Sequence, residues 1–224
     1  MYNSLEFDLA RDALGYLVKK FKIDRIYIPY YLCDVIRHTL YTLNCKPFFY
    51  HIDDNFLPVN KFLPEDYILY PNYFGICHYN VKKLVESYPR MIIDNAHSYY
   101  DSPHGFACFN AGHKFGFKKS ILWFKDEICN NCIMPSKQNF QTYHESFVEL
   151  HEKYKKQNLL KIDNIDKVCS FVYPLLVDTV QNADEIVKQL TMDGKIIYRY
   201  WNSLPKNFNE YKFYSRLIPI PVEF

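Results

Sequence analysis

The sequence predicts an α/β protein with a mainly parallel sheet between layers of helices. Over the first 126 residues, short apolar segments alternate with segments whose apolar residues recur at helical spacing. Strands that are apolar throughout are typical of a parallel sheet covered on both faces. With 224 residues, 49% of them hydrophobic and 23% charged, the chain is long enough to bury one good-sized core.

The elements of this sheet are expected in the following order. The first is a helix over residues 5–20, because Ser4 can cap it and apolar residues recur at helical spacing, at Leu5, Leu9, Ala13 and Leu17. Strands are then expected at 25–28, 47–50, 67–70, 91–93 and 121–124, and helices at about 33–43 and 81–88.

The pattern changes after about residue 126, which predicts a large domain over 1–126 and a reduced C-terminal α+β lobe over 127–224. Helices are expected in this lobe at 145–157 and 183–190, and strands at 170–177, 195–198 and 217–220.

Composition narrows the class of protein. The formal net charge of +2 gives no reason to expect nucleic acid or an anionic membrane as a partner. No apolar run approaches the roughly 20 residues of a membrane span, and residues 1–6 lack the pattern of a secretory signal. Together with seven scattered cysteines, this predicts a cytoplasmic protein with reduced thiols.

The strongest functional signal is an aspartate that ends an apolar run, followed by a lysine twenty residues later. Asp94 comes directly after Met91-Ile92-Ile93, as expected for a carboxylate at the end of a buried strand. Lys114 could form a Schiff base with pyridoxal 5'-phosphate (PLP), while Asp94 keeps the pyridine nitrogen protonated. Taken alone, Asp94 could instead cap a turn, and Lys114 could be a solvated lysine beside Lys118 and Lys119.

The sequence resembles the fold type I PLP-dependent aminotransferases of the DegT/DnrJ/StrS group, which aminate nucleotide-linked sugars. Five segments in family order carry the resemblance, and they are Leu-Ala-Arg-Asp-Ala (9–13), Ile-Tyr-Ile-Pro-Tyr-Tyr-Leu-Cys-Asp (26–34), Asn-Tyr-Phe-Gly (72–75), Ile-Asp-Asn-Ala-His (93–97) and His-Lys-Phe (113–115).

The resemblance implies roles for individual residues. Lys114 would hold PLP, Asp94 would pair with its pyridine nitrogen, and His97 would contact its phenolic oxygen. Without the resemblance, His97 could equally be a surface histidine. Ala10 and Arg11 would hold the phosphate with backbone N–H groups, which requires a helix that starts near Leu9 rather than the helix over 5–20. Tyr30 or Tyr31 could stack on the ring, although each could equally be a packing residue.

The activity implied is transfer of an amine, with glutamate as the expected donor, to a nucleotide-linked keto-sugar in surface polysaccharide biosynthesis, by a homodimer. The chain also departs from the family. Ala111 stands where a serine is common, the loop 116–120 differs, and most members exceed about 350 residues. These departures leave an alternative open, a scaffold that has lost catalysis and acts in binding or regulation.

The pair Cys129 and Cys132 has the spacing of a metal or redox motif. A structural zinc site needs two further ligands, and no second closely spaced pair is evident. No metal site is therefore expected.

Overall fold

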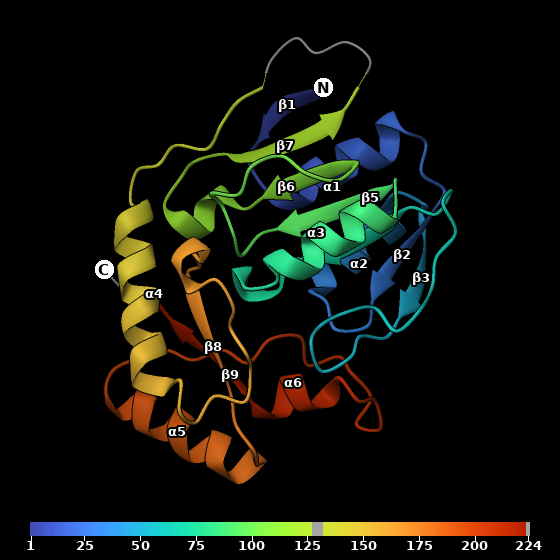
Figure 1. The fold of residues 1–224 in the computed structure, drawn as a ribbon. Helices are drawn as coiled ribbons and strands as arrows, with labels where there is room; N and C mark the ends of the chain where they lie inside the picture. Colours follow the sequence, from blue (N-terminus) through green and yellow to red (C-terminus); the bar gives the residue numbers. More distant parts are fainter. Residues whose placement is uncertain (127–131, 223–224) are drawn as a thin grey trace.

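A seven-stranded sheet forms the centre of the protein in the computed structural model, which describes residues 1–126 and 132–222 (Figure 1). The central strands run parallel, whereas β7 is antiparallel to β6, and β1 is antiparallel to β7. This confirms the predicted α/β fold. In spatial order the strands are β1 (Tyr2–Phe7), β7 (Ser120–Lys125), β6 (Ala107–Asn110), β5 (Met91–Asn95), β4 (Ile68–Pro71), β2 (Arg25–Pro29) and β3 (Lys46–Tyr50).

Helices cover both faces of this sheet. On one face lie α1 (Ala10–Lys20) and α2 (Asp34–Thr42), and on the other lies α3 (His78–Ser87) (Figure 1). Alternate residues of β5 point to opposite faces of the sheet. Ile92 packs in the cluster with α1 and α2, and Ile93 packs in the cluster with α3. Both faces therefore need apolar residues, which explains why the central strands are apolar throughout.

The N-terminal segment differs from the sequence prediction. Residues 2–7 form the edge strand β1, paired with β7, and the helix begins only at Ala10. Leu9 is the N-cap residue and is extended (φ −133°, ψ 147°). The helix predicted from residue 5 is therefore wrong over 5–9. The apolar residues before Ala10 have helical spacing by coincidence. Residues 2–7 are extended because they pair with β7.

The remaining strands and α-helices of residues 1–126 agree with the sequence to within a few residues, with one omission. The sequence reasoning missed β6, a four-residue strand that is buried along its whole length. Its sequence, Ala-Cys-Phe-Asn, contains one large apolar residue and no β-branched residue, so no apolar run marks it as a strand.

The C-terminal part consists of a two-stranded antiparallel sheet and the helices around it. Its elements are α4 (Phe140–Tyr154), a 3₁₀ turn at Ile165–Lys167, β8 (Val172–Leu176), α5 (Val180–Met192), α6 (Tyr211–Arg216) and β9 (Leu217–Pro221). The sequence missed α6 and the first five residues of α4. The strand predicted at 195–198 is wrong, because the segment forms no ladder.

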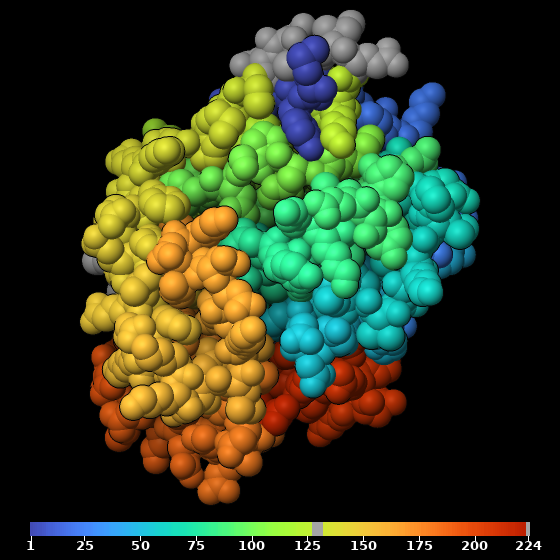
Figure 2. Space-filling model, in the orientation of Figure 1, coloured from blue at the N-terminus to red at the C-terminus, as the bar shows by residue number. Residues whose placement is uncertain are grey.

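This part of the chain packs closely against the first 126 residues. Its own core joins α4, α5, β8 and β9, but Leu176, Phe213 and Leu217 belong to the large cluster beneath α3. The space-filling view shows yellow-to-red residues in continuous contact with the green and cyan half (Figure 2). The boundary at residues 126 and 127 stays a prediction.

The described residues were searched for membrane-spanning helices and for metal-binding clusters. Within 1–126 and 132–222, no helix has the length and apolar character needed to cross a membrane. The same residues contain no group of three or more His, Cys, Asp or Glu side chains arranged to hold a metal ion. Cys132 is exposed, while Cys129 lies outside the described residues.

Candidate active site

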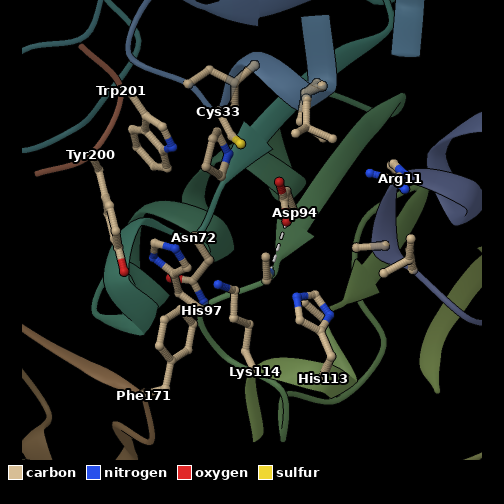
Figure 3. A pocket seen from close by; sticks show the side chains of 18 of the residues that line it. Arg11, Cys33, Asn72, Asp94, His97, His113, Lys114, Phe171, Tyr200 and Trp201 are labelled. Atoms are coloured by element: carbon tan, nitrogen blue, oxygen red, sulfur yellow. Dashed lines mark hydrogen bonds between the residues drawn. The ribbon is translucent and has the colours of Figure 1, made fainter. Parts of the chain in front are cut away.

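A cavity of about 460 Å³ opens at the carboxyl ends of β4 and β5, the edge where ligands collect in parallel sheets. Residues from distant parts of the chain meet there (Figure 3). The polar side chains on its wall include those of Arg11, Asn72, Asp94, His97, His113 and Lys114. The cavity therefore unites the amine and the carboxylate that the sequence singled out.

Asp94 is delivered to the cavity by β5, a strand whose five residues are all buried. Its side chain is only 8% exposed, and its Oδ1 accepts a hydrogen bond of 2.9 Å from the backbone N–H of Ala96. Burial raises the pKa of Asp94 from 3.8 to about 6, although the Ala96 N–H acts in the opposite direction. The carboxylate is thus costly to keep charged unless a cation faces it.

His97 lies three residues further on and is fixed by a backbone donor. The N–H of Phe74 donates to Nδ1 of His97 over 3.0 Å, so Nδ1 carries the lone pair and the proton resides on Nε2. Burial, helped by the charge of Lys114, lowers the pKa of His97 to about 3. His97 is therefore a neutral imidazole whose Nε2–H can donate a hydrogen bond.

The turn that carries this donor has an unusual backbone. Phe74 adopts φ +53° and Gly75 φ +67°, both in the left-handed region that favours glycine. A Cβ at Gly75 would lie 2.7 Å from the carbonyl oxygen of His97. The Asn-Tyr-Phe-Gly segment (72–75) thus places a backbone N–H at the imidazole of His97, and its glycine allows the two chain segments to approach.

Lys114 reaches the cavity from the short 3₁₀ turn η2 (Gly112–Phe115) that follows β6. Its Nζ lies 5.3 Å from the ring centroid of Phe171 and points into the cavity (Figure 3). The turn is tightly folded, since a Cβ on Gly112 would lie 1.8 Å from the carbonyl oxygen of Lys119. Lys114 is exposed overall.

The start of α1 forms another wall of the cavity. Because the helix begins at Ala10, the backbone N–H groups of Ala10 and Arg11 have no acceptor within the helix. Both residues line the cavity. The helix start that the phosphate assignment required is therefore present, and the conflict with the predicted helix over 5–20 is removed.

Comparison with known proteins adds evidence on the fold. No protein-family model and no curated protein sequence matches the chain significantly. Among solved structures, Spr1654 from Streptococcus pneumoniae, described as a sugar aminotransferase and solved in its PLP form, matches with a TM-score of 0.72 at 13% identity, over 99% of this chain and 82% of that one. PseC of Helicobacter pylori, an aminotransferase of pseudoaminic acid biosynthesis, matches with a TM-score of 0.73 at 15% identity, over 97% and 81%.

A DegT/DnrJ/EryC1/StrS aminotransferase from Brucella abortus also matches, with a TM-score of 0.70 at 12% identity, over 98% of this chain and 80% of that one. The chain has the fold of the DegT/DnrJ/EryC1/StrS aminotransferases. At these identities the likeness establishes the fold alone. The chain covers about four-fifths of the length of each of these neighbours.

Two residues expected at the cofactor ring lie elsewhere in this aminotransferase fold. Tyr31 is fully buried and packs against Tyr73 and Trp201. Tyr30 packs against Phe49, and neither tyrosine lines the cavity. Stacking of Tyr30 or Tyr31 on the ring is therefore not supported. Both follow the end of β2, where the chain turns toward the aromatic core before it enters α2.

Several other cavity residues were missed by the sequence reasoning. Cys33 lines the cavity beside α2. Its thiol responds to the charges of Asp94 and Lys114, although burial is the main reason why its pKa is raised. An aromatic wall comes from the C-terminal lobe, where Tyr200 and Trp201 lie beside His97 (Figure 3). Local patterns cannot show that residues a hundred positions apart share one cavity. Only the unusual density of aromatic residues at 198–201 could have drawn notice.

Proposed function

We propose that this chain binds PLP through Lys114 and transfers an amine to the ketone of a sugar. One observation carries the proposal. A single cavity holds an amine, a buried carboxylate and a neutral histidine donor, and the start of a helix forms one of its walls. The volume of about 460 Å³ lies within the usual range of small-molecule sites.

Each polar group of PLP would have a suitable partner among the cavity residues. A protonated ring nitrogen would give Asp94 the cation that its burial calls for. The Nε2–H of His97 would donate to the phenolic oxygen. The free N–H groups of Ala10 and Arg11 would bind the phosphate, since a helix N-terminus favours anions.

The bound cofactor would supply an electron sink for the carbon that gains or loses the amine. The chain's own residues would do the remaining work. Asp94 would hold a proton on the ring nitrogen, and His97 would stabilise negative charge on the neighbouring oxygen. The Nζ of Lys114, once free, would move protons at the reacting carbon, for which its position on the cavity wall is suited.

The substrate class is proposed on two grounds. The fold neighbours include several sugar aminotransferases, and the aromatic wall of Tyr200 and Trp201 offers flat apolar surface of the kind that sugar rings contact. We further propose that the acceptor is a nucleotide-linked keto-sugar, that glutamate is the donor, and that the product enters surface polysaccharide synthesis in the cytoplasm. These finer statements rest on the sequence motifs.

We also propose a homodimer. The motif resemblance implies one, and the exposed side of the cavity at Lys114 would be closed by a second chain. Closure would remove water from the amine and favour its neutral form.

The exposure of Lys114 favours a second candidate, a scaffold with this fold that binds a partner without catalysis. One experiment separates the two. The purified protein is incubated with PLP, reduced with borohydride, digested and mapped by mass spectrometry. An aminotransferase should show a visible absorbance band and a pyridoxyl group fixed on Lys114. Lys118→Ala should behave like wild type, and Lys114→Ala should lose both signals. A wild-type protein that gains no mass on reduction refutes the aminotransferase proposal.

A further inference from the structure

We propose that His113 is a ligand of the cofactor's phosphate group, an inference that rests on the proposed function. His113 precedes Lys114 on η2, and both side chains line the cavity. The sequence reasoning gave His113 no role of its own. Its imidazole would be a side-chain donor at the anionic end of the site.

The position of the imidazole supports this assignment. Figure 3 shows His113 on the side of Lys114 that faces Arg11, away from Tyr200 and Trp201. That side of the cavity also contains the start of α1, where the free backbone N–H groups lie. A phosphate held by α1 would therefore lie on the same side of the cavity as His113.

The backbone of η2 holds His113 in this place. The N–H of Gly112 donates to Ser120 Oγ over 3.2 Å, and the carbonyl of Gly112 accepts from the N–H of Phe117 over 3.0 Å. Gly112 itself has no room for a Cβ. His113 thus projects from a turn that is fixed immediately before it, which reduces the entropy lost when a ligand binds.

Two side chains can donate at this end of the cavity, the guanidinium of Arg11 on α1 and the imidazole of His113. Ala10 and Ala111 line the same cavity but carry no polar group. Two other cavity donors are already engaged elsewhere. Arg199 contacts Asp184 over 2.6 Å and also donates to the carbonyl of Ser215, and Asn72 donates to Asn95 and Asp101.

His113, in contrast, has no hydrogen-bond partner among the residues that the structure describes. Partial burial, with the charge of Lys114 as the second cause, lowers the pKa of His113 below its ordinary value. A neutral imidazole can still donate one N–H to a phosphate oxygen. Hydrogen bonds to a charged acceptor are stronger than those between neutral groups.

The test compares PLP with pyridoxal, which has the same ring and aldehyde but no phosphate. Binding of both compounds is titrated by absorbance for wild type, His113→Asn and the control His38→Asn, which changes an exposed histidine on α2 outside the cavity. We expect His113→Asn to weaken PLP binding about tenfold, as for loss of one charge-assisted hydrogen bond, and to leave pyridoxal binding unchanged. His38→Asn should change neither affinity.

A second variant guards against a general structural effect. Ala111→Ser in the His113→Asn background adds a hydroxyl to the same cavity and should recover part of the PLP affinity without changing that of pyridoxal. The ³¹P resonance of bound PLP should differ between wild type and His113→Asn. Equal losses for PLP and pyridoxal, or no loss of PLP affinity, overturn the inference while the proposed function stands. A wild-type protein that binds neither compound overturns both.

Discussion

Replacing Asp94 by asparagine should stabilise the cofactor-free protein at neutral pH, although it removes the group that the proposed chemistry needs. Burial raises the pKa of Asp94 from 3.8 to about 6. The folded state therefore holds an additional proton between about pH 4 and pH 6, and wild type loses stability as the pH rises through this range. Each pKa unit corresponds to about 1.4 kcal/mol, so charged Asp94 costs about 3 kcal/mol at pH 8.

The amide side chain in Asp94→Asn would avoid this cost because it has no charge and can still accept the hydrogen bond of Ala96 through Oδ1. The free energy of unfolding, from urea denaturation, should rise by about 2–3 kcal/mol in Asp94→Asn at pH 8. The gain should fall to about 1 kcal/mol at pH 4.5, where Asp94 is mostly protonated in the folded state. The exposed control Asp166→Asn should change little at either pH.

Added PLP should favour wild type over Asp94→Asn in this comparison of stabilities. The wild-type carboxylate gains a cationic partner when the cofactor binds, whereas the amide does not. PLP should therefore raise the unfolding free energy of wild type more than that of Asp94→Asn. The reasoning is refuted if Asp94→Asn is less stable than wild type at pH 8, or if its effect does not depend on pH.

Two further predictions concern the geometry around His97. Its imidazole should remain neutral between pH 5 and pH 9, because burial lowers its pKa to about 3; a His97 ring resonance that titrates near pH 6.5 in an NMR experiment would contradict this. Gly75→Ala should cost about 3 kcal/mol, from left-handed strain and a clash with the His97 carbonyl. Gly194→Ala, at φ +86° with open space around it, should cost only the strain of about 1 kcal/mol, and equal losses of unfolding free energy would argue against the clash.

The sequence predicted the central elements well because they obey local rules. The apolar runs of β4 and β5 reflect burial at every position, and the helical spacing in α2 and α3 reflects burial that recurs about every 3.6 residues. Asp94 stood out for the same reason, since a carboxylate that ends a buried strand has few structural explanations.

Failures occurred where pairing partners decide the conformation. Residues 2–7 become a strand because β7 lies beside them, more than a hundred residues along the chain. Residues 195–198 have strand-forming side chains, but no neighbouring strand in the described part of the chain pairs with them, and Ile196 and Tyr198 are exposed. Strand propensity alone does not form a strand without a ladder.

By itself, the sequence determined most of the central strands and helices and singled out Asp94 and Lys114 as candidate site residues, because both depend on local pattern and chemistry. Only the tertiary structure decided where α1 begins, which tautomer His97 adopts, and that His113, Tyr200 and Trp201 share the cavity. Those outcomes depend on contacts between segments distant in the chain, and the free energy of such contacts is set by the packed structure rather than by any one segment.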